Sequence, residues 1–579
     1  MASTLQRLDA YLATLLSDWG LATTFIAVAV AALVAYPIFY PDEPDTHPLL
    51  LARQSSAAPI RNKNESAAYR SPETPYGTNL RSGLNVRDAG ALRWAGGKDG
   101  DLRDVWREVQ KGGQQGEDGK EVPRGLIMTV LGRDEVVEHD VSDISKEIGI
   151  LGRHWKAAGV TKVAIYLPNS VEYLSAVFGE LLVIKVCRIS ACAFYGLTPI
   201  LLPYKQPHAR VYALLNSTGA DGLVCAAGNL PLDDVAKSCA NIQLLTWVVE
   251  KTSRHMDWNG VPGAAEGLLK VSVWHDVVAE NMAAASSDLP SNDTGEAPTD
   301  LIAVWQSTDP YKAPEIVTFT HRNLVSATAA LISALPLRQR LTPADMLLPV
   351  SPFTHTYVLC QTFAALFTHA SLAVNSVAVP GVELDKASRG VSPTVIVASA
   401  ETMAALHAQE TAGLTSVAQR VHKYTHGQSM SAGRMPKDGW LFRMLAPSTS
   451  STEPGKLRLI LTSERLGADT PALSSTMLSD LRIFTGARIC YALTVAAVAG
   501  AVAQTNVFDY RRENGAGCSH FGSPLSSVEI MMVDGENDTR LGGAQPEGEI
   551  LVSGPAVSGG KVRLGVKGRI LEDGTLAYA

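Results

Sequence analysis

Short apolar runs and longer amphipathic runs alternate through most of the chain. Residues 160–168 and 316–319 are rich in β-branched and other apolar side chains, which predicts buried strands. Residues 172–181 and 324–335 place apolar side chains at helical spacing, which predicts helices. Strands that alternate with helices are typical of an α/β fold with stacked, mostly parallel sheets. We therefore expect one large α/β domain over residues 124–579.

The longest apolar stretch lies near the N-terminus. No charged residue occurs between Asp18 and Asp42, and a helix of about 20 apolar residues is long enough to cross a bilayer. We predict a transmembrane helix over residues 19–41, since aromatic residues suited to the membrane interface lie at its two edges. A cleaved signal peptide and a buried helix are the alternatives. A signal peptide would have a basic leader, whereas this leader carries Arg7 against Asp9 and Asp18, which favours the anchor.

Two further segments flank the predicted anchor. In residues 1–18, Ser3 and Gln6 have the spacing of a capping box, and leucines follow at helical spacing. This pattern predicts an amphipathic helix on the membrane surface. Residues 42–123 are rich in proline, glycine and charge, which predicts a flexible tether with one short helix around residues 102–110.

The distribution of basic residues around the predicted anchor indicates its orientation. Arg53, Arg61 and Lys63 follow the anchor, and Arg7 alone precedes it. The side richer in lysine and arginine faces the cytosol. We therefore predict a cytosolic main body held at the endoplasmic reticulum or another endomembrane. The sequence specifies neither which membrane nor the oligomeric state.

Composition narrows the class of protein. The 579 residues are 46% hydrophobic and 18% charged, which is ordinary for a globular chain of several domain-sized units. The net charge of −7 argues against a nucleic-acid partner. The seven cysteines are scattered and include no CxxC pair, which is typical of reduced, buried thiols and predicts neither a disulfide framework nor a zinc site.

One segment, WQSTDPYKAPEIVTFTHRN at residues 305–323, has the layout of a phosphate loop between a strand and a helix. It resembles the T-S-G-T-T-G-x-P-K-G and T-H-R-N signature of the adenylate-forming (AMP-binding) superfamily, to which acyl-CoA synthetases belong. By this resemblance Ser307 and Thr308 take the opening T-S, and these two residues with Lys312 are the candidates for contacts to ATP or AMP. Asp309 stands at the first glycine and Glu315 at the lysine.

These replacements oppose phosphate binding. A phosphate cradle needs glycines, which let successive backbone N–H groups turn toward the anion, and a lysine that neutralises it. The turn has no glycine, and Asp309, Lys312 and Glu315 sum to −1. Two like charges about 4 Å apart repel by about 4 kcal/mol at an effective dielectric of about 20. Even halved to about 2 kcal/mol, this repulsion offsets most of the stabilisation of about 1.5–3 kcal/mol that one hydrogen bond to a charged group provides.

A second group of motifs resembles the substrate side of the same superfamily. Residues 351–357, SPFTHTY, resemble L-P-L-F-H-x-x-G, whose aromatic residue or histidine lines the carboxylate pocket. The resemblance implies that His355 faces an acyl substrate with Phe353 and Tyr357 nearby, and the alternative is a histidine satisfied within the core. Residues 463–466, SERL, replace the G-G-A-P-L that opens the adenine pocket, so a close backbone approach is lost there.

The remaining markers are also altered. Tyr491 and Thr494 match the tyrosine and threonine of Y-G-x-T-E and are further candidates for nucleotide contacts, but Val495 replaces the glutamate that would hold Mg²⁺. Val566 replaces the aspartate of T-G-D that would bind the ribose. The small C-terminal domain of the superfamily, with its second catalytic lysine, is expected to be missing. We therefore predict no metal site, and ATP, CoA and Mg²⁺ are cofactors of the family whose binding here is doubtful.

Two functions follow from these motifs. The first is a membrane-anchored, acyl-CoA-synthetase-like pseudoenzyme that binds a fatty or other carboxylic acid, or acts as a scaffold, and is impaired in adenylation. The second is an active AMP-forming ligase for a long-chain fatty or aryl acid, which uses relocated groups such as Lys312 and a partner protein that supplies the C-terminal domain; Lys312 and the retained Thr494 are the candidate catalytic residues. A chain cut short of a longer protein would explain the missing end but none of the point changes.

Overall fold

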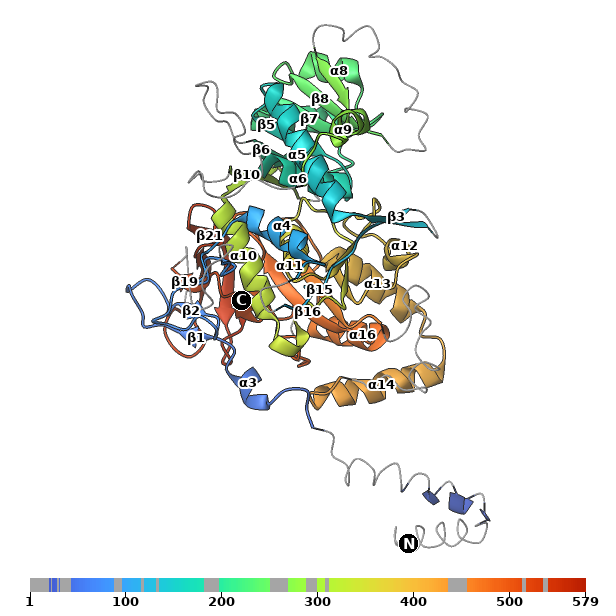
Figure 1. The fold of residues 1–579 in the computed structure, drawn as a ribbon. Coiled ribbons are helices and arrows are strands. Elements are labelled where there is room, and N and C mark those ends of the chain that lie inside the picture. Colours follow the sequence, from blue (N-terminus) through green and yellow to red (C-terminus); the bar gives the residue numbers. More distant parts are fainter. Residues whose placement is uncertain are drawn as a thin grey trace, which may run out of the picture.

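The computed structural model contains three β-sheets, and Figure 1 shows helices packed between and around them. The structure describes eight residues between 20 and 31 and residues 43–87, 96–115, 119–131, 135–181, 197–249, 269–287, 299–307, 312–435, 456–512, 517–534 and 540–579. The mostly parallel, helix-covered sheets confirm the predicted α/β class.

The first sheet has seven strands in the order β11-β10-β6-β5-β7-β8-β9, and only the edge strand β11 is antiparallel to its neighbour. Its strands are β5 (Lys162–Tyr166), β6 (Thr198–Leu201), β7 (Gly222–Ala226), β8 (Leu244–Val248), β9 (Lys270–Val273), β10 (Leu301–Trp305) and β11 (Glu315–Phe319). Its helices are α5 (Val141–Ala157), α6 (Val171–Leu181), α7 (His208–Thr218), α8 (Leu232–Ser238) and α9 (Trp274–Met282). Apolar residues of α7 and α8 fill one face, and those of α5, α6 and α9 join the main core on the other.

The second sheet has nine strands in the order β18-β17-β16-β15-β14-β12-β13-β3-β4. Its strands are β3 (Ile127–Leu131), β4 (Glu135–His139), β12 (Met346–Pro349), β13 (Ser371–Val374), β14 (Val395–Ser399), β15 (Leu459–Arg465), β16 (Arg488–Thr494), β17 (Ala503–Gln504) and β18 (Ser523–Pro524). Its helices are α10 (His321–Ala334), α11 (Thr356–Phe367), α12 (Leu384–Ser388), α13 (Ala400–Ala412), α14 (Val417–Ser431), α16 (Ser475–Thr485) and the short 3-10 helix η2 (Leu337–Gln339). The central strands from β3 to β16 run parallel, so their carboxyl ends meet at one edge.

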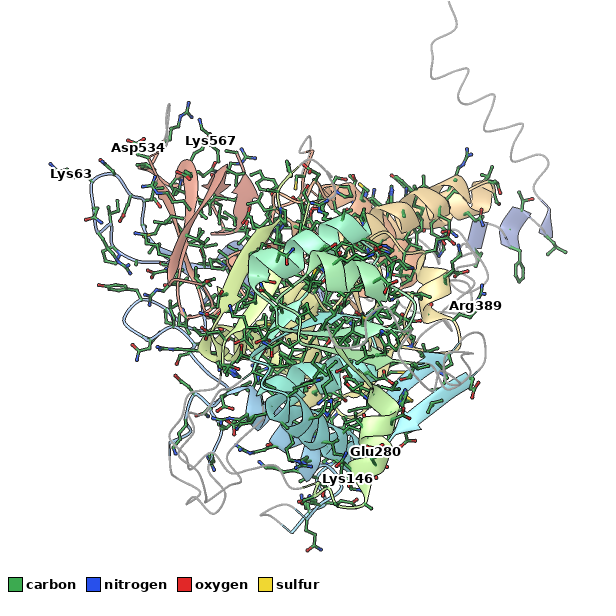
Figure 2. The ribbon with its side chains drawn as sticks, turned by 90° about the horizontal axis from the view of Figure 1, so that it is seen from above. Lys63, Lys146, Glu280, Arg389, Asp534 and Lys567 are labelled. Carbon is green, nitrogen blue, oxygen red and sulfur yellow. The ribbon has the colours of Figure 1, made fainter. Side chains whose placement is uncertain are left out.

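The third sheet is antiparallel and joins the two ends of the chain. It has the order β1-β2-β19-β20-β21-β22. Its strands are β1 (Ser56–Ala57), β2 (Tyr69–Arg70), β19 (Glu529–Val533), β20 (Glu547–Ser553), β21 (Lys561–Ile570) and β22 (Leu576–Tyr578). A separate bridge joins Glu65 to Val533, and Figure 2 shows Lys63 on the same side of the molecule as Asp534 and Lys567.

Residues 42–123 were predicted to be a flexible tether with one short helix around residues 102–110; the helix is present as α4 (Leu102–Lys111), but other described parts of the segment belong to the folded domain. The segment also supplies β1, β2 and the short helix α3 (Pro48–Ala52). Arg61 and Arg70 form ion pairs with Glu529, at 2.9 and 2.7 Å. Sequence composition suggested a tether because proline, glycine and charge are common here. The polar residues instead pair with partners more than 450 positions away, which no local pattern shows.

The N-terminal predictions fall mostly outside the described residues. This applies to the amphipathic helix over residues 1–18 and to most of the span over residues 19–41. Among the described residues, no helix combines the length and the apolar character needed to cross a membrane. The anchor therefore stays a prediction.

Candidate functional site

The candidate site lies at the carboxyl edge of the nine-stranded sheet. In parallel sheets, loops that follow the carboxyl ends of the strands form the usual ligand sites. His355 follows β12, Glu401 follows β14, and Arg465 and Thr494 end the neighbouring strands β15 and β16, where they are paired in register. The connection between β10 and β11, which contains the predicted phosphate loop, faces this edge through contacts to residues 465–469.

The loop between β10 and β11 is held by Asp469. The Ser307 hydroxyl donates to Asp469 Oδ2 at 2.6 Å, and Lys312 Nζ lies 3.0 Å from Asp469 Oδ1. The lysine and aspartate side chains are about half exposed, at 50% and 47%. On the outer side of the loop, Arg210 donates to the Lys312 carbonyl oxygen. The structure therefore brings together two of the three predicted loop residues, on a carboxylate that sequence reasoning did not identify. Thr308 and Asp309 lie outside the described residues.

Arg465 occupies the adjoining position, where the superfamily has the adenine pocket. Its side chain is 6% exposed and lies over the Trp305 ring, with the guanidinium carbon 4.7 Å from the ring centroid. Its Nη2 donates to the Gln306 carbonyl oxygen at 2.6 Å. Burial lowers the pKa of Arg465 to about 10, and Glu401 acts in the opposite direction. Arg465 is therefore a buried cation that supports the start of the loop.

His355 and Glu401 lie near this cation. The pKa of His355 is lowered well below its usual value, first by desolvation and then by the positive charge of Arg465. A neutral imidazole is therefore the form present at neutral pH. Both carboxylate oxygens of Glu401 are buried without a hydrogen-bond partner. The edge thus holds a cation, a carboxylate and a neutral histidine, which is a polar environment able to orient a small charged or polar group.

The two aromatic residues predicted beside His355 are part of the core. Phe353 is fully buried, and its ring lies 5.4 Å from that of Tyr173. Tyr357 is 1% exposed and donates to Gln504 Oε1 at 3.1 Å. Both side chains are therefore buried against other protein groups.

Tyr491 and Thr494 both contact Glu464, the neighbour of Arg465. The hydroxyls of Tyr491 and Tyr578 donate to the Glu464 carboxylate, and Thr494 Oγ1 donates to the Glu464 carbonyl oxygen at 2.7 Å. Desolvation raises the pKa of Glu464, and the two tyrosine hydrogen bonds offset part of this effect. Both candidate nucleotide contacts are therefore buried and have protein partners.

The other altered markers have clear positions. Val495 is 4% exposed and belongs to the main hydrophobic core, so a metal ion would find no oxygen ligand there. Glu315 is exposed and is paired in register with Trp305 at the start of β11. Val566 packs against the same core from β21. Within the part of the chain that the structure describes, no group of three or more histidine, cysteine or acidic residues could hold a metal ion.

The T-H-R-N sequence has a structural role. Thr320 and Asn323 form a reciprocal capping box at the start of α10. The Asn323 amide also donates to the carbonyl oxygens of Pro555 and Val557, at 2.7 and 3.1 Å. His321 Nδ1 accepts from the Leu102 backbone N–H at the start of α4, at 3.4 Å. The motif therefore joins three distant segments without using the loop that precedes it.

Sequence reasoning missed four residues that dominate the edge: Glu401, Glu464, Arg465 and Asp469. One signal was available. Residues 456–465, KLRLILTSER, carry an apolar run into two adjacent charges, and a charged pair at the end of a buried strand often marks a functional edge. For Glu401 and Asp469 the sequence offers no local signal, because Arg465, which lies near Glu401, and Ser307 and Lys312, which contact Asp469, are far away along the chain.

The three sheets and the site at the carboxyl edge define the class: an α/β domain with the architecture of acyl- and aryl-CoA ligases. Residues 313–560 match the family model described as AMP-binding enzyme. The anthranilate CoA ligase AuaEII, solved with anthranoyl-AMP, aligns with a TM-score of 0.57 and 14% identity over 83% of this chain and 77% of that chain. A long-chain-fatty-acid-CoA ligase from Archaeoglobus fulgidus aligns with a TM-score of 0.55 and 14% identity over 86% of each chain.

The N-terminal domain of FACL13 from Mycobacterium tuberculosis aligns with a TM-score of 0.54 and 13% identity, over 83% of this chain and 99% of that chain. No curated protein sequence matches the chain. At these identities the structural matches show the fold alone. The chain therefore has the fold of acyl- and aryl-CoA ligases, and residues 313–560 within it match the AMP-binding enzyme family model.

Proposed function

We propose that this protein is a membrane-anchored, acyl-CoA-synthetase-like pseudoenzyme that binds a fatty or other carboxylic acid and is impaired in ATP-dependent adenylation. The observation that carries the proposal is the pairing of Lys312 with Asp469 at 3.0 Å. Lys312 is the only cation in the sequence of the loop, and its charge is already matched by a carboxylate.

The residues at the edge do not fit ATP and Mg²⁺. Asp309, Lys312 and Glu315 sum to −1, and Asp469 adds another negative charge to give −2 beside the expected position of the phosphates. Val495 cannot ligate a hard cation. The buried Arg465 and Glu464 stand where the superfamily keeps small residues for the adenine. We therefore assign no step of catalysis to a bound nucleotide.

The acid-binding part of the proposal rests on the polar residues grouped around Arg465. His355, Glu401 and Arg465 supply polar groups, and Glu401 and Arg465 each keep buried polar atoms without hydrogen bonds. A carboxylate ligand is suited to Arg465, whose guanidinium presents donors in a planar fork. The anthranilate and long-chain-fatty-acid ligases share this fold, which supports an aryl or fatty acid as the ligand class.

Membrane anchoring is supported by the few N-terminal residues that the structure describes. Leu21, Phe25 and Val28 are 92%, 82% and 63% exposed, at positions one helical turn apart. Apolar side chains repeated in this way on a helix need an apolar environment to cover them. The predicted span over residues 19–41 would place them in lipid.

The second candidate is an active AMP-forming ligase for a long-chain fatty or aryl acid. Thr494 at the end of β16 favours it, because this hydroxyl is kept where the superfamily has its threonine. In this case Lys312 would have to leave Asp469 to reach a phosphate.

A nucleotide titration on the full-length protein separates the two candidates. We expect no measurable affinity for ATP–Mg²⁺ near physiological concentration, and no acid-dependent exchange of pyrophosphate into ATP, because the loop is net negative. Isothermal titration calorimetry and a radiolabel exchange assay measure these quantities. Micromolar affinity in the unmodified protein would instead support the active ligase.

Variants that change the charge of the loop predict the direction in which nucleotide affinity changes. Changing Glu315→Lys together with Asp309→Gly moves the loop by three charge units, from −1 to +2, and should raise nucleotide affinity without restoring turnover. Asp469→Asn should raise affinity further, since it frees Lys312 and asparagine accepts the positive φ of 56° at this position. Asp233→Asn, an exposed change on α8, is the matched control and should have no effect.

A further inference from the structure

Helix α14 has two unlike faces. Its inner face packs against α16, where Met430 is 1% exposed and joins a small apolar cluster with Ile483 and Tyr510. Lys423 on the same face lies 2.6 Å from Asp480. These contacts fix which side of the helix points outward.

The outer face of α14 carries an exposed apolar stripe. Val417, Val421 and Tyr424 are 75%, 55% and 68% exposed, and their spacing of four and three residues places them on one side. Helix α3 adds Leu49 and Leu50, which are 72% and 63% exposed. Figure 1 shows α3 and α14 along the same edge of the molecule, at the end farthest from the seven-stranded sheet. Scattered exposed apolar residues are ordinary, but a group on one edge marks an interaction surface.

The charge of α14 fits an anionic, apolar partner. Helix α14 contains no acidic residue, and the exposed Arg420 lies within its apolar stripe. Arg53 directly follows α3 and is also exposed. Apolar side chains, a tyrosine and arginine on one helix face are typical of helices that lie in the interface of a membrane.

The path of the chain places this edge beside the predicted anchor. The Asp45 backbone N–H donates to the Gly433 carbonyl oxygen at 3.0 Å, just past the end of α14. Asp45 is only four positions beyond the end of the predicted span at residue 41. Four extended residues reach at most about 14 Å. A bilayer that holds the anchor must therefore lie close to the C-terminal end of α14.

We propose that the outer face of α14, with Leu49 and Leu50 of α3, docks on the lipid bilayer that holds the N-terminal anchor. This surface, which we name the docking edge, rests on the anchor in the proposed function. It adds a second contact, which orients the body so that the seven-stranded sheet points away from the membrane. The carboxyl edge of the nine-stranded sheet is then held at a fixed orientation to the lipid.

Lipid photolabelling of the full-length protein tests the docking edge. The protein is reconstituted in vesicles of phosphatidylcholine and phosphatidylserine that contain a phospholipid with a photoreactive acyl chain, and adducts are located by peptide mass spectrometry. We expect adducts in residues 19–41, on α14 between Val417 and Tyr424, and on α3. Val136 on β4 and Ile316 on β11, which are 39% and 41% exposed, are internal controls and should stay unlabelled.

Variants complete the test. Val421→Ser combined with Tyr424→Ser should remove the adducts on α14 and leave those in residues 19–41. Arg420→Gln should weaken labelling of α14 only when phosphatidylserine is present, because its contribution is electrostatic. Circular dichroism checks that each variant remains folded.

The outcomes separate this inference from the proposed anchor. Labelling of residues 19–41 without α14 overturns the docking edge and leaves the anchor intact. A protein that neither floats with the vesicles nor carries any adduct overturns both. Cross-links between two copies through α14, with no lipid adduct there, would mean that a second copy covers this face and would also overturn the inference.

Discussion

At the end of β15, two adjacent charged residues point to opposite sides of the sheet. Successive side chains of a strand alternate between its faces. Arg465 therefore reaches Trp305 and Gln306 of the first sheet, and Glu464 reaches Tyr578 of the third. One dipeptide thus links all three sheets at the candidate site. It occupies positions where the superfamily has small residues, and it places two buried charged groups at this edge.

Glu464 makes stability depend on pH. Desolvation raises the pKa of this carboxyl group in the folded state. The contribution of the protonated group to stability is fully present below its unfolded pKa, about 4.3, and is lost as pH rises through the folded value. In the Glu464→Gln variant the side chain is neutral at every pH, so the variant does not lose this stability as pH rises. We expect the melting temperature of the variant minus that of wild type to increase as pH rises from about 4 to about 7.5.

Thermal melts followed by circular dichroism measure this difference across the pH range. Glu383→Gln, on an exposed position before α12, is the control and should give a constant difference. Parallel curves for Glu464→Gln and wild type would contradict the assignment of a raised pKa to Glu464.

At the scale of single elements, α4 shows how a segment that was predicted to be mostly tether becomes part of the core. Its N-terminus is closed by a capping box between Asp101 and Asp104. Leu102, Val105 and Trp106 are almost fully buried, and α4 packs against α10, α11 and α6. The short helix was predicted around residues 102–110, but its burial depends on partners that the sequence does not identify.

Trp106 provides a direct test of this packing. Its indole N–H donates to Ser145 Oγ at 3.0 Å, and its ring lies 4.9 Å from that of Phe178. Trp106→Ala should lower the free energy of unfolding by about 3–5 kcal/mol, as for other large aromatic residues removed from a core. Lys111→Ala on the same helix, where the side chain is 55% exposed, should change it by no more than about 0.5 kcal/mol.

Chemical denaturation at equilibrium gives both values. If Trp106→Ala were as mild as Lys111→Ala, α4 would be a surface helix on a tether, as the composition of residues 42–123 first indicated.

At the scale of the whole molecule, the beginning and end of the described chain close one sheet. Strand β2 pairs with β19, and Arg61 and Arg70 surround the Glu529 side chain, which is 8% exposed. Burial alone would raise the pKa of Glu529, but hydrogen bonds from the two arginines outweigh it and lower the pKa. The domain therefore includes residues that a boundary at residue 124 would remove.

This arrangement predicts how the protein responds to truncation. A chain that starts at residue 124 loses both arginines and exposes the edge of β19, so it should aggregate or unfold. A chain that starts at residue 43 keeps these contacts and should fold. Size-exclusion chromatography and circular dichroism distinguish the two. A monomeric, stable chain from residue 124 would mean that the third sheet does not need its N-terminal strands.

The sequence by itself determined the α/β class, the strands around residues 160–168 and 316–319 with the helices that follow them, and the likeness to a superfamily. These depend on local periodicity and spaced motifs, which follow from the geometry of strands and helices. It also determined the altered charge of the loop, because Asp309, Lys312 and Glu315 are close in sequence.

Only the tertiary structure decided which groups meet at the candidate site. Asp469 reaches Lys312 across 157 positions, and Glu529 meets Arg70 across 459. Such pairs depend on how sheets stack, and no periodicity within one segment encodes them. The same reason explains why residues 42–123 were predicted as a tether. Their polar side chains have the composition of a linker, and only the partners brought together by folding make them part of the domain.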